Sequence, residues 1–120
     1  MANEDSIMTP ELVQTAIREI VSLICAREFE AALQHCAISR LTASDIQAVI
    51  DDYGRTPANP PIGAEQFDDV VNVEGRLDPT WSVRTPLWTL EEGRSDLTLE
   101  LTVTQRADGL SIEIDDLGVL

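Results

Sequence analysis

The chain has 120 residues, with 22 acidic side chains against eight basic ones, all of them arginine, and a net charge of −14. This length predicts a single domain over residues 1–120, large enough for one hydrophobic core without metal or disulfide cross-links. A surface of this charge repels phosphate backbones, and both halves of the chain are acidic, so the composition argues against nucleic acid as a partner.

The N-terminal segment is polar and acidic. Residues 1–8 are expected to form a frayed leader, and they lack the pattern of a signal peptide. The longest mostly apolar run, residues 20–26, is far shorter than the roughly 20 residues of a membrane-spanning helix. Two cysteines are too few for a multi-bridge secreted framework. These observations favour a cytoplasmic protein that does not associate with membranes.

Residues 10–54 are predicted to form a helical half. Thr9 followed by Pro10 is typical of a helix start. The apolar positions that follow recur every three or four residues and predict one buried stripe: Val13, Ile17, Ile20, Val21 and Ile24. After a bend near Arg27, residues 28–36 are expected to form a short second helix.

A third helix is predicted between Thr42 and Gly54. Thr42 and Asp45 have the spacing of a capping box, and Gly54 is the residue type best suited to a left-handed helix end. Residues 55–66 contain three prolines, which remove backbone donors and disfavour helix. They are therefore expected to connect the helical half to a β half.

Residues 67–120 are predicted to form an antiparallel β meander, because the apolar period changes to two. Four strands are expected, with these residues inward: Val71, Val73, Trp81, Val83, Thr85, Leu87, Leu97, Leu99, Leu101, Val103, Leu110, Ile112 and Ile114. The pair Asp108 and Gly109 is a hairpin signal, and Pro86 indicates an edge position or a bulge.

The predicted fold class is therefore α+β, with the N-terminal helices packed on a curved, four-stranded antiparallel sheet. This arrangement resembles the cone-shaped fold of nuclear transport factor 2 and of cystatin-like proteins.

The sequence offers little for catalysis. His35 and Cys36 are adjacent and would point about 100° apart on a helix, so they do not form a nucleophilic pair, and Cys36 is expected to fill the core. With Cys25 they supply at most three soft ligands and no Cys-x-x-Cys pair, so no metal site is expected. The glycine spacing matches no nucleotide-binding loop, and no cofactor is expected.

The carboxylates are the remaining candidates. The strand alternation places Glu100, Glu113 and Asp115 on the solvent-exposed face of the sheet, where acidic residues ordinarily increase solubility. A net charge of −14 exceeds the magnitude of about 2–8 that suffices for solubility. Binding to a cationic partner is therefore a further reason for the acidity. A buried acid in a cavity would instead indicate an enzyme or a ligand carrier.

Trp88 is offset by one position from the inward set of its strand. Either a bulge at Pro86 turns Trp88 into the core, or the indole is exposed and anchors a partner. In the second case it would lie beside three acids, Glu91, Glu92 and Asp96. Arg94 is expected to pair locally with these acids and to order the turn.

Residues 87–99 and 112–120, together with 42–54, resemble a family of small bacterial proteins of unassigned function. That family includes immunity proteins of contact-dependent growth inhibition and related polymorphic toxin systems, and the resemblance spans residues 10–120. It implies a protein that binds the C-terminal toxin domain of its own system and so protects the cell. It implies no catalytic residue and no contact residue.

The acidity suits such a role, because many of these toxins are cationic nucleases whose groove an acidic inhibitor could occupy. The candidate partner-binding residues are Asp68, Asp69, Trp88, Glu91, Glu92, Asp96, Glu113 and Asp115. The alternative is a small enzyme or ligand-binding protein of the nuclear transport factor 2 class, with a carboxylate in its cavity.

Overall fold

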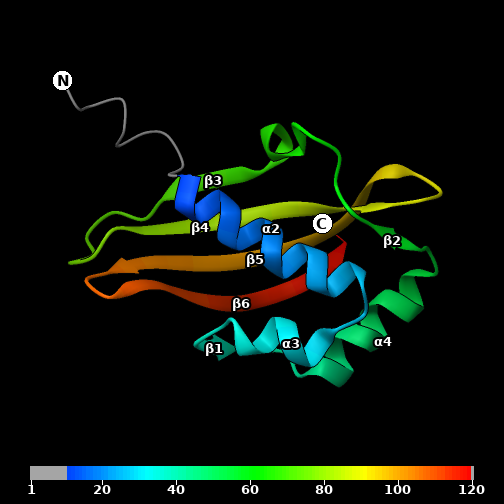
Figure 1. Cartoon of the computed structure of the whole chain (residues 1–120), viewed down its shortest axis with the longest axis horizontal. Helices are drawn as coiled ribbons and strands as arrows, with labels where there is room; N and C mark the ends of the chain where they lie inside the picture. Colours follow the sequence, from blue (N-terminus) through cyan, green and yellow to red (C-terminus); the bar gives the residue numbers. More distant parts are fainter. Residues whose placement is uncertain (1–10, 120) are drawn as a thin grey trace.

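The computed structural model describes residues 11–119, which form three α-helices, one 3-10 helix and a six-stranded sheet. The elements in chain order are α2 (Glu11–Cys25), α3 (Phe29–Gln34), β1 (Ile38–Ser39), α4 (Ala43–Tyr53), β2 (Pro57–Ala58), η1 (Ala64–Phe67), β3 (Asp69–Asn72), β4 (Thr80–Thr89), β5 (Gly93–Arg106) and β6 (Gly109–Val119) (Figure 1). The α+β class is confirmed. The leader predicted for residues 1–8 and the helix start at Thr9 and Pro10 lie outside the described residues.

The sheet differs from the predicted four-stranded antiparallel meander. Its strand order is β1-β6-β5-β4-β2, with β3 also beside β4, and β1 runs parallel to β6, so the sheet is mixed. The two strands that were not predicted, β1 and β2, are two residues long and therefore leave no alternating pattern in the sequence. Long-range hydrogen bonds define β1: the amides of Ala37 and Arg40 donate to carbonyls of β6.

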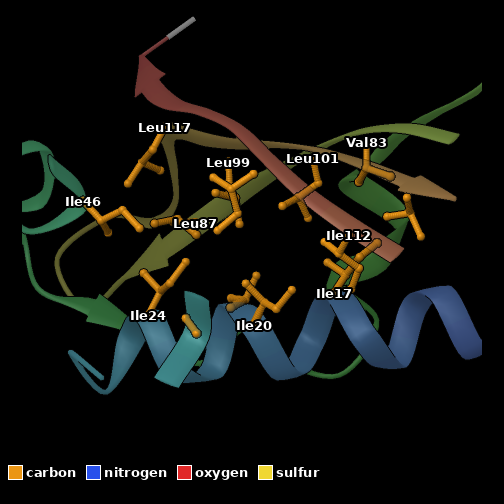
Figure 2. Packing of buried hydrophobic residues seen from close by; sticks show 14 of the residues in the cluster. Ile17, Ile20, Ile24, Ile46, Val83, Leu87, Leu99, Leu101, Ile112 and Leu117 are labelled. Carbon is orange, nitrogen blue, oxygen red and sulfur yellow. The ribbon is translucent and has the colours of Figure 1, made fainter. Parts of the chain in front are cut away.

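Helix α2 crosses the sheet and buries its predicted stripe against it. Figure 2 shows Ile17, Ile20 and Ile24 pointing from the helix to the side chains of β4, β5 and β6. All five residues of the stripe are at most 3% exposed. The helix ends where Arg27 takes a positive φ of 62°, and α3 follows at once, so the predicted bend is confirmed.

Helix α4 has the ends that its sequence predicts. The Asp45 amide donates to the Thr42 hydroxyl oxygen at 3.1 Å, and the Thr42 amide donates to the Asp45 carboxylate at 2.9 Å. Gly54 ends the helix with a φ of 79°, a conformation that costs glycine little. Ile46 and Ile50 face the core from this helix.

The inner face of the sheet carries the predicted apolar residues of β4, β5 and β6, and these form the core together with the buried residues of the helices (Figure 2). One strand was predicted in the wrong phase. Val70, opposite Val83, packs against the core, whereas Val71 is 54% exposed. The segment Val70-Val71-Asn72-Val73 offers apolar residues at both phases, so periodicity alone does not select the buried face.

The predicted irregularity near Pro86 is present, but its extra residues are in the opposite strand. Leu87 of β4 faces three residues of β5, 95–97, and the Ser95 hydroxyl donates to the Leu87 carbonyl at 2.8 Å. Pro86 itself lies between the stretches of β4 that pair with β3 and with β2, which confirms the predicted edge position. The alternation of β4 continues through Thr89, so Trp88 is not turned into the core.

No helix within residues 11–119 is both long enough and apolar enough to cross a membrane.

Candidate functional site

One face of the sheet has no helix on it among residues 11–119, because α2, α3 and α4 all contribute to the core on the opposite side (Figure 1). We call this helix-free surface of β3 to β6 the outer face. Its charged residues are Asp69, Arg84, Glu100, Arg106, Glu113, Asp115 and Asp116, and Arg94 and Asp96 lie at its end. Acidic side chains therefore outnumber basic ones on this face.

Four of these charges stand in one row across the strands. Asp69 lies opposite Arg84, Arg84 opposite Glu100, and Glu100 opposite Asp116. Arg84 Nε is 3.6 Å from Glu100 Oε1, so the arginine forms an ion pair with the glutamate from the β4 side. On the other side two carboxylates occupy directly opposite positions, an arrangement that destabilises a sheet.

A bulge adds a third carboxylate at the same place. Between the pairs that Glu100 and Leu101 form with β6, Asp115 is the extra residue of β6. It accepts a hydrogen bond of 2.7 Å from the Thr102 hydroxyl, and Arg40 Nε lies 3.9 Å away. Asp115 and Asp116 therefore both lie beside Glu100, whereas strict alternation would have sent one of them inward.

Glu91 and Glu92, in the β4–β5 turn, make contacts within the fold. Glu91 accepts hydrogen bonds of 2.8 Å from both the amide and the hydroxyl of Thr56. Glu92 accepts hydrogen bonds from Tyr53 Oη at 2.9 Å and from the Thr89 hydroxyl at 3.1 Å. The two carboxylates hold the turn against the end of α4 and the start of the connector.

These contacts change the pKa values of two side chains, Glu91 and Tyr53. The hydrogen bonds from the Thr56 amide and hydroxyl hold the pKa of the Glu91 carboxyl below its ordinary value. Removal from water, reinforced by the Glu92 carboxylate, raises the pKa of the Tyr53 hydroxyl. The acid pair therefore has a structural role that does not require a partner.

A cavity of about 190 Å³ lies between α2, the connector and β4. Ile17 and Val21 line it from the helix, Ala64 from η1, and Thr85 and Trp88 from β4. At one side the Ser22 hydroxyl donates to Asn59 Oδ1 at 2.9 Å, which joins the helix to the connector.

Asp68, directly after η1, is the partly buried acid of this cavity. Burial raises the pKa of the Asp68 carboxyl above its ordinary value, the Glu65 carboxylate adds to this, and contact with the Thr85 side chain opposes it. None of the ion pairs among the described residues includes Asp68. Its charge in the cavity is therefore not balanced by an ion pair.

An aromatic pair lies beside the cavity, to which it contributes Trp88. The Phe67 ring meets Trp88 edge-on, with centroids 6.0 Å apart, and the Arg94 guanidinium lies 4.2 Å from the Phe67 centroid. The ion pairs of the described residues do not include Arg94, so its predicted pairing with the acids of the turn is replaced by this stacking. Asp96 is exposed in the neighbouring irregular part of β5.

The thiols are packed as the sequence indicates. Cys25 and Cys36 both lie against the core, and burial raises the pKa of each thiol to about 11. His35 is exposed beside Cys36. Within residues 11–119 no three His, Cys, Asp or Glu side chains gather closely enough to hold a metal ion.

The eight predicted partner-binding residues thus fall into three groups. Asp69, Glu113 and Asp115 lie on the outer face, with Asp96 at its end; Glu91 and Glu92 lie in the β4–β5 turn; Asp68 and Trp88 line the cavity. Sequence reasoning missed Arg84 and Asp116 as members of the acidic row. The bulge at Asp115 decides that Asp116 faces outward, and only the strand pairing reveals it.

Comparison with known protein families matches residues 21–120 to a domain of unknown function, DUF7668. The chain belongs to this family. The match includes all six strands and all eight predicted site residues. The comparisons with curated proteins and with solved structures found no match. The DUF7668 description names no activity, so the function must be argued from the geometry of the chain itself.

Proposed function

We propose that this DUF7668 protein is a cytoplasmic immunity protein. It binds the toxin domain of a contact-dependent growth inhibition or related polymorphic toxin system and neutralises it without catalysis or a cofactor. The toxin is a basic nuclease, since a protein that holds a phosphate backbone needs a cationic groove. Covering that groove or the active site stops the reaction. The resemblance of residues 87–99 and 112–120 to immunity proteins supports this role.

The observation that carries the proposal is the row of carboxylates on the outer face. Glu100 and Asp116 stand opposite each other, and the bulge adds Asp115 to them. Like charges at such positions lower the stability of the sheet. Glu100 pairs with Arg84 and Asp115 with Arg40, but none of the ion pairs among the described residues includes Asp116. A cationic surface placed over them would relieve the repulsion and would also speed the encounter by electrostatic steering.

We assign the contact surface to the outer face: Asp69, Asp96, Glu100, Glu113, Asp115 and Asp116. Glu91 and Glu92, which are bound to Thr56 and Tyr53, shape the turn instead.

The test begins with capture. The tagged protein is incubated with lysate of a source strain at about 50 mM and about 500 mM salt, because screening distinguishes charge-driven from apolar binding. The captured protein is identified, purified and assayed for cleavage of DNA and tRNA with and without the chain. A basic nuclease, held more weakly at high salt and inhibited at equal molar amounts, is the expected result.

Matched variants assign the surface. E100Q/D115N/D116N removes three charges from the outer face, and E19Q/E30Q/D52N removes three from exposed helix positions. The first set should weaken inhibition at least tenfold, and the second should leave it within about twofold. Equal effects of the two sets would contradict the assignment to the outer face.

A second candidate function is favoured by a different observation, the carboxylate in the cavity. We propose as this alternative a small ligand-binding protein or enzyme with the cone-shaped fold of the nuclear transport factor 2 and cystatin-like class. The long helix that packs on a curved sheet supports that fold, and Asp68 beside a volume of about 190 Å³ supports a ligand.

A further inference from the structure

The cavity beside Asp68 has the size of a small organic ligand. An engineered apolar cavity of about 150 Å³ binds benzene, and this one measures about 190 Å³. It therefore admits an aromatic ring together with one polar substituent. A ligand for this cavity presupposes the second candidate function, in which the cavity is a ligand site.

Much of the cavity wall is apolar. Ile17 and Val21 of α2 are at most 3% exposed, and Ala64 of η1 is 8% exposed. Pro60 and Pro61 of the connector continue this wall. A ligand body of hydrocarbon character gains from burial against such side chains, whereas a fully hydrated ion does not.

The polar part of the wall is negative and accepts hydrogen bonds. The Asp68 carboxyl meets Thr85, and the Asn59 amide lies at the connector side. Two further charged residues line the cavity, Arg18 and Glu65, and both are exposed at its rim. The one hydrogen bond of Arg18 among the described residues goes to Thr15, at 3.4 Å, so Arg18 does not neutralise Asp68.

A partly desolvated carboxylate without an ion pair is stabilised by a cation that enters its site. We propose that this cavity binds a small organic monocation, an amine with a hydrocarbon body of about the size of one ring, and that Asp68 is its counter-ion. The ammonium group donates to Asp68 and Thr85, and the hydrocarbon body lies against Ile17 and Val21.

The experiment uses three probes of one shape and different charge: benzylamine, benzyl alcohol and benzoate. Each is titrated into the full-length protein while the methyl resonances of Ile17 and Val21 are followed by NMR. Benzylamine should saturate these shifts with a dissociation constant on the order of 1 mM, as its small size allows. The alcohol should bind at least tenfold more weakly, and benzoate should not bind.

Asp68→Asn and Asp69→Asn are the matched variants, since the two residues are adjacent and Asp69 points to the outer face. Asp68→Asn should weaken benzylamine binding at least tenfold, and Asp69→Asn should leave it within twofold. Binding to the native protein should also weaken as the pH falls through the Asp68 pKa. Equal binding of alcohol and amine, or unchanged binding in Asp68→Asn, overturns the charge assignment while the cavity remains a ligand site. Failure of all three probes overturns the second candidate function as well.

Discussion

The two faces of the sheet differ in the residues that they carry: the inner face is apolar and buried, and the outer face is charged. On the inner face, Leu99 and Leu101 of β5 are fully buried in the core cluster, which also contains residues of α2, α4 and the neighbouring strands. On the outer face, Glu100 lies between them in sequence and stands opposite another carboxylate. Packing accounts for the two buried leucines, whereas the repulsion between Glu100 and Asp116 lowers the stability of the sheet. This difference is the reason for proposing the outer face, and not the inner one, as the contact surface.

The largest expected effect is a difference in the free energy of unfolding between substitutions at two neighbouring residues of β5. Leu101→Ala removes a fully buried side chain and should lower the free energy of unfolding by about 2–5 kcal/mol. Thr102→Ala, on the outer face, loses the hydrogen bond to Asp115, which is worth about 1.5 kcal/mol at this partly exposed site. Urea denaturation of both variants measures the contrast. Equal destabilisation would remove the distinction between the faces.

Removing the N-terminal cap of α4 should have an intermediate effect on the free energy of unfolding. Thr42→Ala removes the cap of α4 and should lower the free energy of unfolding by about 1 kcal/mol. Thr42→Ser keeps the hydroxyl and serves as the control, with a change close to zero. The same denaturation series checks both. A neutral Thr42→Ala would mean that the cap adds nothing to the folded state.

Removing an outer-face charge should act in the opposite direction. Asp116→Asn relieves the repulsion with Glu100 and should raise the free energy of unfolding by about 0.2–0.5 kcal/mol at low salt. The gain should vanish near 0.5 M salt, since the charges are exposed to screening. Glu19→Gln, exposed in the middle of α2, is the control. If Asp116→Asn destabilised the protein instead, the acidic row would belong to the fold.

The smallest effect concerns the cavity carboxyl and depends on pH. Because burial raises the Asp68 pKa in the folded state, the folded chain takes up a proton at Asp68 before the unfolded chain does. The native protein should therefore gain stability relative to Asp68→Asn as the pH falls from 7 through the raised pKa. Paired denaturation curves at several pH values measure this difference. A native protein that instead loses stability relative to Asp68→Asn as the pH falls would mean that the Asp68 pKa is lowered, not raised.

Local patterns in the sequence were enough for much of the fold. The stripe of α2, the Thr42 capping box and the alternation of β4 and β5 each depend on residues close in the chain, and each is confirmed. The strands β1 and β2 were missed because two residues carry no period and their partners lie far along the chain. The phase of β3 was wrong for a related reason, since Val70 and Val71 are equally apolar.

The candidate site was harder to predict than the fold. Glu91 is bound to Thr56 and Glu92 to Tyr53, contacts over more than 30 residues that no spacing rule indicates. Asp68 and Asp69 look alike in sequence, yet one lines the cavity and the other lies on the outer face. The acidic row depends on strand register and on one bulge, which are decided by tertiary pairing.

The most direct test of the outer face as a binding surface is the affinity of three proteins for the captured toxin domain, measured from about 50 to 500 mM salt. These are the native chain, E100Q/D115N/D116N and the helix control E19Q/E30Q/D52N. The outer-face variant is expected to bind at least tenfold more weakly at low salt and to have a flatter salt dependence, while the control follows the native chain. Identical curves for all three proteins would contradict a binding role for the outer face.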